Sequence, residues 1–283
     1  MEFKPRLPKR NSNVSHQSPF KDFSTLMLGI IAIFVAIYFS LGLVIDQTVE
    51  YVSPQAEAKF FANFDHQLFV DIHKQEPDKQ ETEQVQQQWQ QVLNKIEYCA
   101  QVDYPIDLTV VNAKQINALA FPGGKVIVFS GLNDVLVSEN AMAFVLAHEL
   151  AHFSNRDHLR MMGRGAVLMA ILTLIGQANS DIAQLISPIN QYETAQFSQF
   201  NESEADKQAL KTLNCAYGHV GGASEFFEKL KAQPEQLDFA MMHYFATHPE
   251  INLRIKQIND LTEQMGYQNE AVINRIKREI TID

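Results

Sequence analysis

The longest hydrophobic run of the chain lies close to its N-terminus. Residues 23–45 contain no charged side chain and are mostly Leu, Ile, Val, Phe and Ala. In a helix, which rises about 1.5 Å per residue, a run of this length crosses the roughly 30 Å of hydrocarbon in a bilayer. The pattern therefore predicts one transmembrane helix at 23–45, with a basic tail at 1–22 and a single domain at 46–283.

Within residues 46–283 the hydrophobic spacing predicts mostly helices and a few strands. Apolar residues recur at helical intervals over Glu81–Lys95 and indicate an amphipathic helix. Alternation predicts a strand over Ile106–Val111. A strand pair or one bent strand is expected over Asn117–Ser130, around Pro122-Gly123-Gly124. An α+β fold, mainly helical with a small mixed sheet, follows from these elements. Further helices are predicted over Glu225–Lys231, Leu253–Met265 and Val272–Ile280.

A shorter apolar stretch, Gly165–Gly176, lies in the middle of the chain. Its residues are too few to span a bilayer. Three alternatives remain for it: a helix in the core, a helix on the membrane surface, or a lid over a cleft.

Basic residues flank the predicted transmembrane helix unequally. Five lysines and arginines precede it, whereas Lys59 is the one basic residue in the twenty that follow. Because basic flanks stay in the cytoplasm, the N-terminus is expected there and residues 46–283 outside; in a bacterium this means an inner-membrane protein with a periplasmic domain. A cleaved signal peptide, cut at Ala56-Glu57-Ala58, is the alternative, but the apolar run is longer than a signal peptide needs.

Net charge and cysteine content limit the classes of function. The formal net charge of −10 would repel a phosphate backbone, so nucleic acid is not expected as a partner. Cys99 and Cys215 are the two cysteines. They either form a disulfide, as an oxidising compartment allows, or stay buried thiols, and neither has the spacing of a zinc ligand.

A zinc-binding pattern, His148-Glu149-Leu150-Ala151-His152, follows a nearly all-apolar run. Residues four apart share a helical face, so His148 and His152 can direct ring nitrogens at one metal ion. Glu149 is turned about a quarter of the circumference away, beside the open metal position, where it can take a proton from zinc-bound water. The alternative, an amphipathic helix with solvated histidines, is disfavoured by the apolar run, because buried histidines need partners.

A third ligand is expected downstream, because catalytic zinc sites use three protein ligands and leave one position open. Glu202 and Asp206 are four apart on one helical face, with Glu204 on the opposite side. We therefore assign Glu202 as the ligand, and Asp206 is placed to accept the other ring N–H of a zinc histidine. A solvated acidic helix start is the alternative.

Four blocks occur in order between about Asn117 and Ile255. They are Ala120-Phe121-Pro122-Gly123-Gly124 with the strand-like Lys125–Phe129, the zinc helix continuing into Asn155-Arg156-Asp157, the segment Glu202–Asp206, and Thr247-His248-Pro249 with Arg254. Together they resemble the membrane-associated gluzincin metallopeptidases, the family of HtpX, BepA and the CAAX prenyl peptidases. The resemblance implies a zincin-type fold with His148, His152 and Glu202 as zinc ligands and Glu149 as general base.

The same resemblance places His248 and Arg254 near the metal. There they are expected to stabilise the oxyanion formed during peptide cleavage. A second hypothesis is that His248 occupies the open metal position when substrate is absent and holds the enzyme latent. The alternative is that Thr247-His248-Pro249 only ends one helix and starts the next.

The strand beside the zinc helix is the expected place for the substrate. Zinc peptidases commonly bind a peptide as an extra strand at a sheet edge, through backbone hydrogen bonds. An interior strand, paired on both sides, is the alternative. The residues predicted to form the edge are Asn117, Ala118, Leu119, Ala120 and Phe121.

A membrane-anchored zinc endopeptidase, with one zinc ion per chain and a polypeptide substrate, is the predicted function. The resemblance suggests envelope protein quality control, with unfolded or misassembled proteins as substrates. Two alternatives are a zinc-containing, chaperone-like binding module with little proteolysis, which the intact Glu149 disfavours, and a structural zinc site, which would prefer four ligands and cysteine. The oligomeric state is not indicated. Other histidines lack ligand spacing and are expected at the surface or as caps: His66, His73, His158, His219 and His243.

Overall fold

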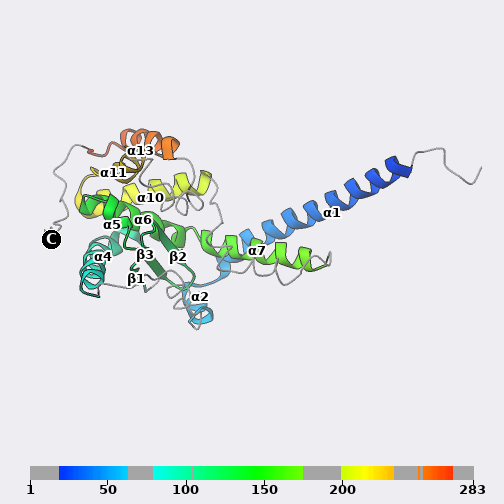
Figure 1. Cartoon of the computed structure of the whole chain (residues 1–283), viewed down its shortest axis with the longest axis horizontal. Helices are drawn as coiled ribbons and strands as arrows, with labels where there is room; N and C mark the ends of the chain where they lie inside the picture. The colour runs from blue at the N-terminus through cyan, green and yellow to red at the C-terminus, as the bar shows by residue number, and fades with distance from the viewer. Residues whose placement is uncertain are drawn as a thin grey trace, which may run out of the picture.

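The structure, a computed structural model, describes residues 19–62, 79–103, 105–174, 199–232, 248 and 251–269. A long N-terminal helix extends away from a body of helices packed round a small sheet (Figure 1). Several predicted features lie outside the described residues: the helix Val272–Ile280, Thr247, Pro249, and the histidines His66, His73 and His243.

Helix α1, Pro19–Thr48, contains the predicted transmembrane segment 23–45. Large apolar side chains are exposed along it, among them Phe20 at 78% and Leu28 at 67%. Among the described residues it is the one helix that is long and apolar enough to cross a membrane. Apolar surface of this extent is unfavourable in water and favourable in lipid, so the helix fits a membrane anchor. A short 3-10 turn, Val49–Tyr51, and helix α2, Pro54–Phe60, follow it.

Helix α6, Glu139–Ser154, forms the centre of the body (Figure 1). Every side chain from 140 to 153 is buried. Because a helix can be buried all round only when other elements cover each of its sides, α6 determines where its neighbours pack. The elements that pack round it are α4 (Lys79–Ala100), α10 (Gln199–Tyr217), α11 (Glu225–Ala232) and the sheet, while α13 (Ile251–Met265) packs on α10 and α11.

The described strands form one mixed sheet: β1 (Asp107–Val111), β2 (Ala118–Phe121) and β3 (Lys125–Phe129). Their order is β1-β3-β2, with β1 parallel and β2 antiparallel to β3. The predicted turn joins β2 to β3, and Gly123 and Gly124 both have a φ of 85°, which glycine adopts without strain. A mainly helical body with a small mixed sheet confirms the α+β class. A short helix, α5 (Leu132–Val135), follows β3.

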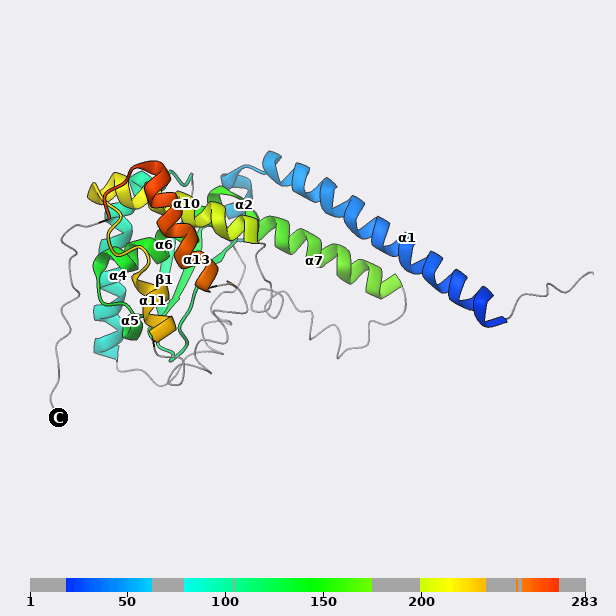
Figure 2. The same cartoon turned by 90° about the horizontal axis from the view of Figure 1, so that it is seen from above.

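Helix α7, Asp157–Leu174, leaves the body alongside α1 (Figure 2). Gly163 permits a close approach, since a Cβ there would lie 2.6 Å from Cγ2 of Ile45. Arg164 pairs with Asp46 at 2.5 Å. Of the apolar stretch Gly165–Gly176, the residues whose burial is described, 165–167, are exposed or half-buried. A core helix is therefore wrong for this part, and the membrane-surface and lid alternatives stay predictions.

Cys99 and Cys215 form a disulfide that joins the C-terminal turns of α4 and α10. The alternative of two buried thiols is wrong. The bridged residues are 116 apart in sequence, and in the chain-entropy account a loop of this length stabilises the fold by about 4–5 kcal/mol. The bridge fastens α10, which carries Glu202 and Asp206, to a second helix that packs on α6.

Candidate metal centre

Defined caps fix the ends of α6 and therefore the direction of its histidines. The side chain of Ser138 accepts a hydrogen bond from the N–H of Ala141 at 3.1 Å and starts the helix. The four-residue spacing then puts His148 and His152 on one face. Both are buried, at 3% and 0% exposure, and so is Glu149, at 2%. The alternative of solvated histidines is wrong.

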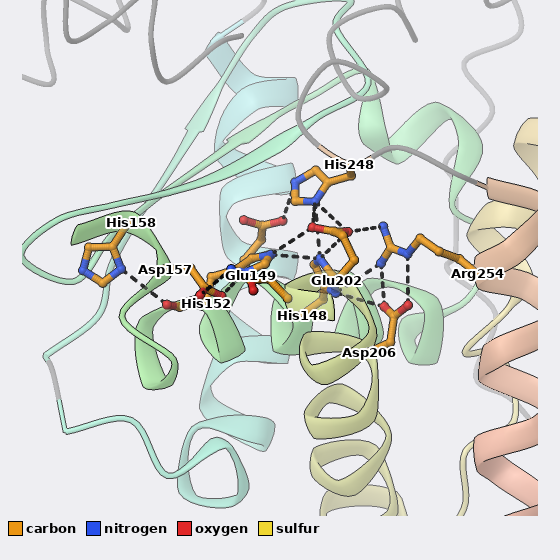
Figure 3. Close-up of polar contacts among 10 residues, drawn as sticks. His148, Glu149, His152, Asp157, His158, Glu202, Asp206, His248 and Arg254 are labelled. Atoms are coloured by element: carbon orange, nitrogen blue, oxygen red, sulfur yellow. Dashed lines mark hydrogen bonds and ion pairs between the residues drawn. The ribbon is translucent and has the colours of Figure 1, made fainter. Parts of the chain in front are cut away.

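Four side chains from three segments meet in the interior: His148, His152, Glu202 and His248 (Figure 3). One candidate ligand atom of each lies within 4.8 Å of all the others. The Nε2 atoms of His148 and His152 are 3.2 Å apart, and oxygens of Glu202 lie 3.5 Å and 3.6 Å from them. Nδ1 of His248 lies 3.0 Å from Glu202 and 3.4 Å from Nε2 of His148. Four donors this close are able to share one ion.

An aspartate holds the second ring nitrogen of each α6 histidine. Nδ1 of His148 donates to Asp206 at 3.0 Å, and Nδ1 of His152 donates to Asp157 at 2.8 Å. With both Nδ1 atoms so engaged, the two Nε2 atoms face each other across 3.2 Å. When both rings are neutral, each Nε2 presents a lone pair to the space between them, and a divalent metal ion there would take up both lone pairs, so the donor set fits such an ion.

Arg254 binds Glu202 and Asp206, the two buried acidic side chains of α10. Its Nη1 donates to Glu202 at 2.8 Å, while Nε and Nη2 donate to Asp206 at 3.0 Å and 2.5 Å. The arginine is 1% exposed, and its guanidinium carbon lies 4.5 Å from the centre of the Phe227 ring. Buried charge is costly unless it is paired, and here one cation pairs with two carboxylates. Arg254 therefore holds Glu202 and Asp206 in place, while its expected contact with an oxyanion stays a prediction.

Burial and neighbouring charge oppose each other at the titrating groups. Burial acts to raise the pKa of Glu202, but His248, Arg254 and His148 hold it well below its usual value. Burial also acts to raise the pKa of Asp206, which Arg254 and His148 lower instead. For His148, burial and Arg254 act to lower the pKa, yet Glu202 and Asp206 raise it to about 9. Burial lowers the pKa of His248. Glu202 and Asp206 are therefore ionised at neutral pH and able to act as acceptors.

Glu149 faces the ring nitrogen of His248 that does not contact Glu202. Its Oε1 is 3.5 Å from Nε2 of His248, whose Nδ1 contacts Glu202 (Figure 3). His248 itself is fully buried, at 0% exposure. A helix boundary alone does not account for these contacts, because both ring nitrogens face carboxylates of the site.

The contact of Asp157 with His152 is not among the predictions from the sequence, where Asp157 stands only in the block that follows the zinc helix. Its second oxygen accepts from Asn201 of α10 at 2.8 Å, so Asp157 links α10 to the turn after α6. An acidic residue five positions after a predicted ligand was the available signal. Glu204, placed opposite the site by the sequence, pairs with Lys207 at 3.4 Å, and its side chain is 35% exposed.

Two further histidines lie apart from the four that meet. His158 is expected at the surface or as a cap. A surface position is wrong, because His158 is fully buried. Its Nδ1 lies 3.4 Å from the carbonyl oxygen of His152 in the last turn of α6, and its Nε2 donates to Glu57 at 2.8 Å. Glu57 lies about a hundred positions earlier in the chain, so no local spacing indicates the pair. His219 is half-buried and accepts a hydrogen bond from the N–H of Gly221.

The predicted substrate edge, residues 117–121, coincides with β2 and the residue before it. In the sheet formed by the described strands, β2 is an end strand, and it lies beside α6. Its side chains are buried, at 6% exposure or less, and the N–H of Ala118 donates to the side chain of Asn117. Among the described strands β2 pairs on one side, with β3, and the substrate edge stays a prediction.

A buried His-Glu-x-x-His helix, joined by a glutamate from a second helix, defines a metallopeptidase site of the gluzincin type. The sequence model of peptidase family M48 matches residues 79–262. The chain belongs to peptidase family M48.

Named relatives agree with this assignment. The beta-barrel assembly-enhancing protease of Yersinia pestis is 30% identical over 173 residues, which are 57% of this chain and 35% of that protein. The mitochondrial metalloendopeptidase OMA1 of Schizosaccharomyces pombe is 30% identical over 171 residues, 60% of this chain and 50% of that one. The metalloprotease LoiP of Escherichia coli is 30% identical over 162 residues, which are 55% of this chain and 62% of that protein. The chain thus spans between about a third and three fifths of the length of these relatives. Together with the family match, their names confirm the resemblance to metallopeptidases.

Proposed function

We propose that this metallopeptidase is a zinc-dependent endopeptidase, anchored in a membrane by α1, that cuts unfolded or misassembled proteins in a cell envelope. The buried group of His148, His152 and Glu202 beside Glu149 is the observation that carries the proposal. Two imidazoles and a carboxylate are a donor set that zinc takes in catalytic sites, where a fourth position stays open for water.

Each residue of the group has a separate role in the proposed reaction. When bound, the metal supplies Lewis acidity, which activates a water molecule and polarises the carbonyl of the peptide. His148, His152 and Glu202 hold the metal. Glu149 takes a proton from the attacking water and passes it to the leaving amine. Asp206 and Asp157 act indirectly, because they fix the tautomers and directions of the two histidines.

His248 is the proposed latch. Its Nδ1 is close enough to the other three donors to occupy the fourth metal position, which would exclude water. Its Nε2 faces Glu149, so the same ring covers the proposed base. Displacement of His248 by a substrate would open both positions at once, and the oxyanion contact is then left to Arg254.

The edge of β2 is the proposed binding place for an extended substrate, formed by Asn117 to Phe121. Its neighbour α6 carries Glu149, so a peptide added there would run past the metal group. The other end of the sheet is closed: Gln86 of α4 donates to the carbonyl of Leu108 at 2.9 Å and accepts from the N–H of Val110 at 2.7 Å. A strand added to β1 would have to displace this side chain.

The catalytic domain is proposed to lie outside the cytoplasm, periplasmic if the source is bacterial, with the N-terminus inside. The basic flank of α1 supports this orientation. The disulfide Cys99–Cys215 supports it independently, since disulfides persist in oxidising compartments. Relatives named as beta-barrel assembly-enhancing proteases support a role in envelope quality control.

The substitution Glu149→Gln tests the proposed base. In the full chain, purified with zinc, we expect it to retain the metal and to lower cleavage of reduced casein by about 10²–10⁴-fold, because the proton acceptor is lost. Glu204→Gln is the matched control and should cleave as wild type does. Wild-type turnover by Glu149→Gln would show that Glu149 is not the base. No cleavage by any form, with zinc bound one to one, would instead favour the chaperone-like binding module.

Removal of His248 tests the latch. His248→Ala should raise the rate of casein cleavage several-fold, because the fourth position would then be open to water in every molecule. His219→Ala, outside the metal group, serves as the control. A large fall in rate would assign His248 a role in catalysis rather than latency, and an unchanged rate would remove it from both.

Backbone N-methylation of a peptide substrate tests the edge of β2. In an antiparallel pair, alternate residues direct their N–H groups to the partner strand. When backbone nitrogens are methylated one at a time, methylation at every second position along the peptide should therefore slow its cleavage, and methylation at the positions between should not. Peptides with the methyl group on the side chain, Gly→Ala at the same positions, are the controls. Uniform tolerance away from the scissile bond would rule out binding by strand addition.

Thiol labelling tests the orientation. In Cys99→Ser, the partner Cys215 on the surface of α10 becomes a free thiol. A membrane-impermeant maleimide should label it in bacterial spheroplasts that express the full chain, while the wild type stays unlabelled because its thiols are bonded. Labelling of Cys99→Ser only after lysis would place the domain in the cytoplasm.

A further inference from the structure

We propose that Glu57, on the helix that follows the membrane anchor, is a positioning residue for the metal centre and acts on His152 through Asp157. The inference rests on the proposed metal site and adds a residue outside the segment 79–262 that matches peptidase family M48. The proposed role of Glu57 concerns the direction of the His152 ring, so it can be tested separately from the role of Glu149 as the base.

The carboxylate of Glu57 is buried and bonded on three sides. The residue is 1% exposed. Its Oε1 accepts from the N–H of Gly123 at 2.8 Å and from Nε2 of His158 at 2.8 Å, and its Oε2 accepts from Nη1 of Arg156 at 2.7 Å. Ser53 caps the helix that carries it by accepting from the N–H of Ala56. A buried carboxylate with three donors defines its surroundings more narrowly than an apolar side chain would.

Two of these partners, Arg156 and His158, flank Asp157. Arg156 has a φ of 58°, in the left-handed region that a side chain other than glycine rarely adopts. This residue also donates to the carbonyl oxygen of Val52, so the segment after α1 holds it at two points. Asp157 in turn accepts from Nδ1 of His152 at 2.8 Å. The direction of Nε2 of His152 therefore depends on a turn that Glu57 fixes from both sides.

The third partner joins the same carboxylate to the sheet. Gly123 lies in the turn directly after β2, and a Cβ there would come within 3.4 Å of Cβ of Phe61 and 3.6 Å of Cα of Ala58. Helix α2 therefore lies directly against this turn. Glu57 thus bonds both to the turn at the end of the proposed substrate strand and to the turn beside the metal centre. It therefore fixes the position of one turn relative to the other.

A double-mutant cycle tests the proposal. Zinc affinity is measured by competition with a chelator on the full chain in detergent, for wild type, Glu57→Gln, Asp157→Asn and the double variant. We expect Glu57→Gln to weaken zinc binding by about 10–100-fold, the range for groups that orient metal ligands. The double variant should bind zinc as Asp157→Asn does, because both changes act on His152 by one route. The control Glu50→Gln, in the same segment with a side chain 70% exposed, should bind zinc as wild type does.

A structural role alone gives a different result. It would lower the resistance of Glu57→Gln to denaturant and leave the zinc affinity of the folded protein unchanged, and this result would overturn the proposal. The proposal would also be overturned if the losses of zinc affinity in the two single variants added up in the double variant. If Glu57→Gln does not fold, Glu57→Asp keeps the charge, shortens the reach and enters the same cycle. A wild-type protein that binds no zinc would overturn the metal centre itself, whereas turnover by Glu149→Gln would not touch the role of Glu57.

Discussion

Buried negative charge is the constraint on which the rest of the structure depends. Glu202 and Asp206 lie on one face of α10, both inside the protein, and among the described residues Arg254 is the arginine that pairs with them. The second positive charge that these carboxylates need comes from His148, whose pKa they raise to about 9, or from a divalent ion beside Glu202 when that ring is neutral. The helices are packed so that these groups meet: α10 lies against α6, α13 brings Arg254, and the disulfide fastens α10 to α4. A structure that served only to bury apolar surface would not need this arrangement.

The parts of the fold that follow from the sequence are those set by local spacing. Apolar periodicity predicts a helix over Glu81–Lys95, and the structure has Lys79–Ala100; alternation predicts Ile106–Val111, and the structure has Asp107–Val111. The same local reasoning places His148 with His152, and Glu202 with Asp206, because each pair is one helical turn apart. These relations survive in any tertiary context, so they can be predicted without it.

The remainder depends on contacts between distant segments. His158 has no neighbour in sequence that explains its burial, since its partner Glu57 lies far earlier in the chain. The stretch that starts at Gly165 is apolar enough for a core, yet the helix that contains it, α7, lies along α1, because Gly163 accommodates Ile45 and Arg164 meets Asp46. Composition alone does not distinguish an apolar surface that packs on a core from one that packs on an anchor. Only the packed chain decides between them.

The hydrogen bonds of Gln86 protect one edge of the sheet against aggregation with unfolded chains. An exposed sheet edge recruits any extended chain, and repeated recruitment is the first step of aggregation. Because the amide of Gln86 already pairs with the backbone of β1, an unfolded chain finds no template at that end of the sheet. If capture occurs at β2, it occurs beside the helix that carries Glu149. A chain captured and cut there would leave in pieces too short to seed a fibre, so the open edge of β2 would not become a nucleus for aggregation.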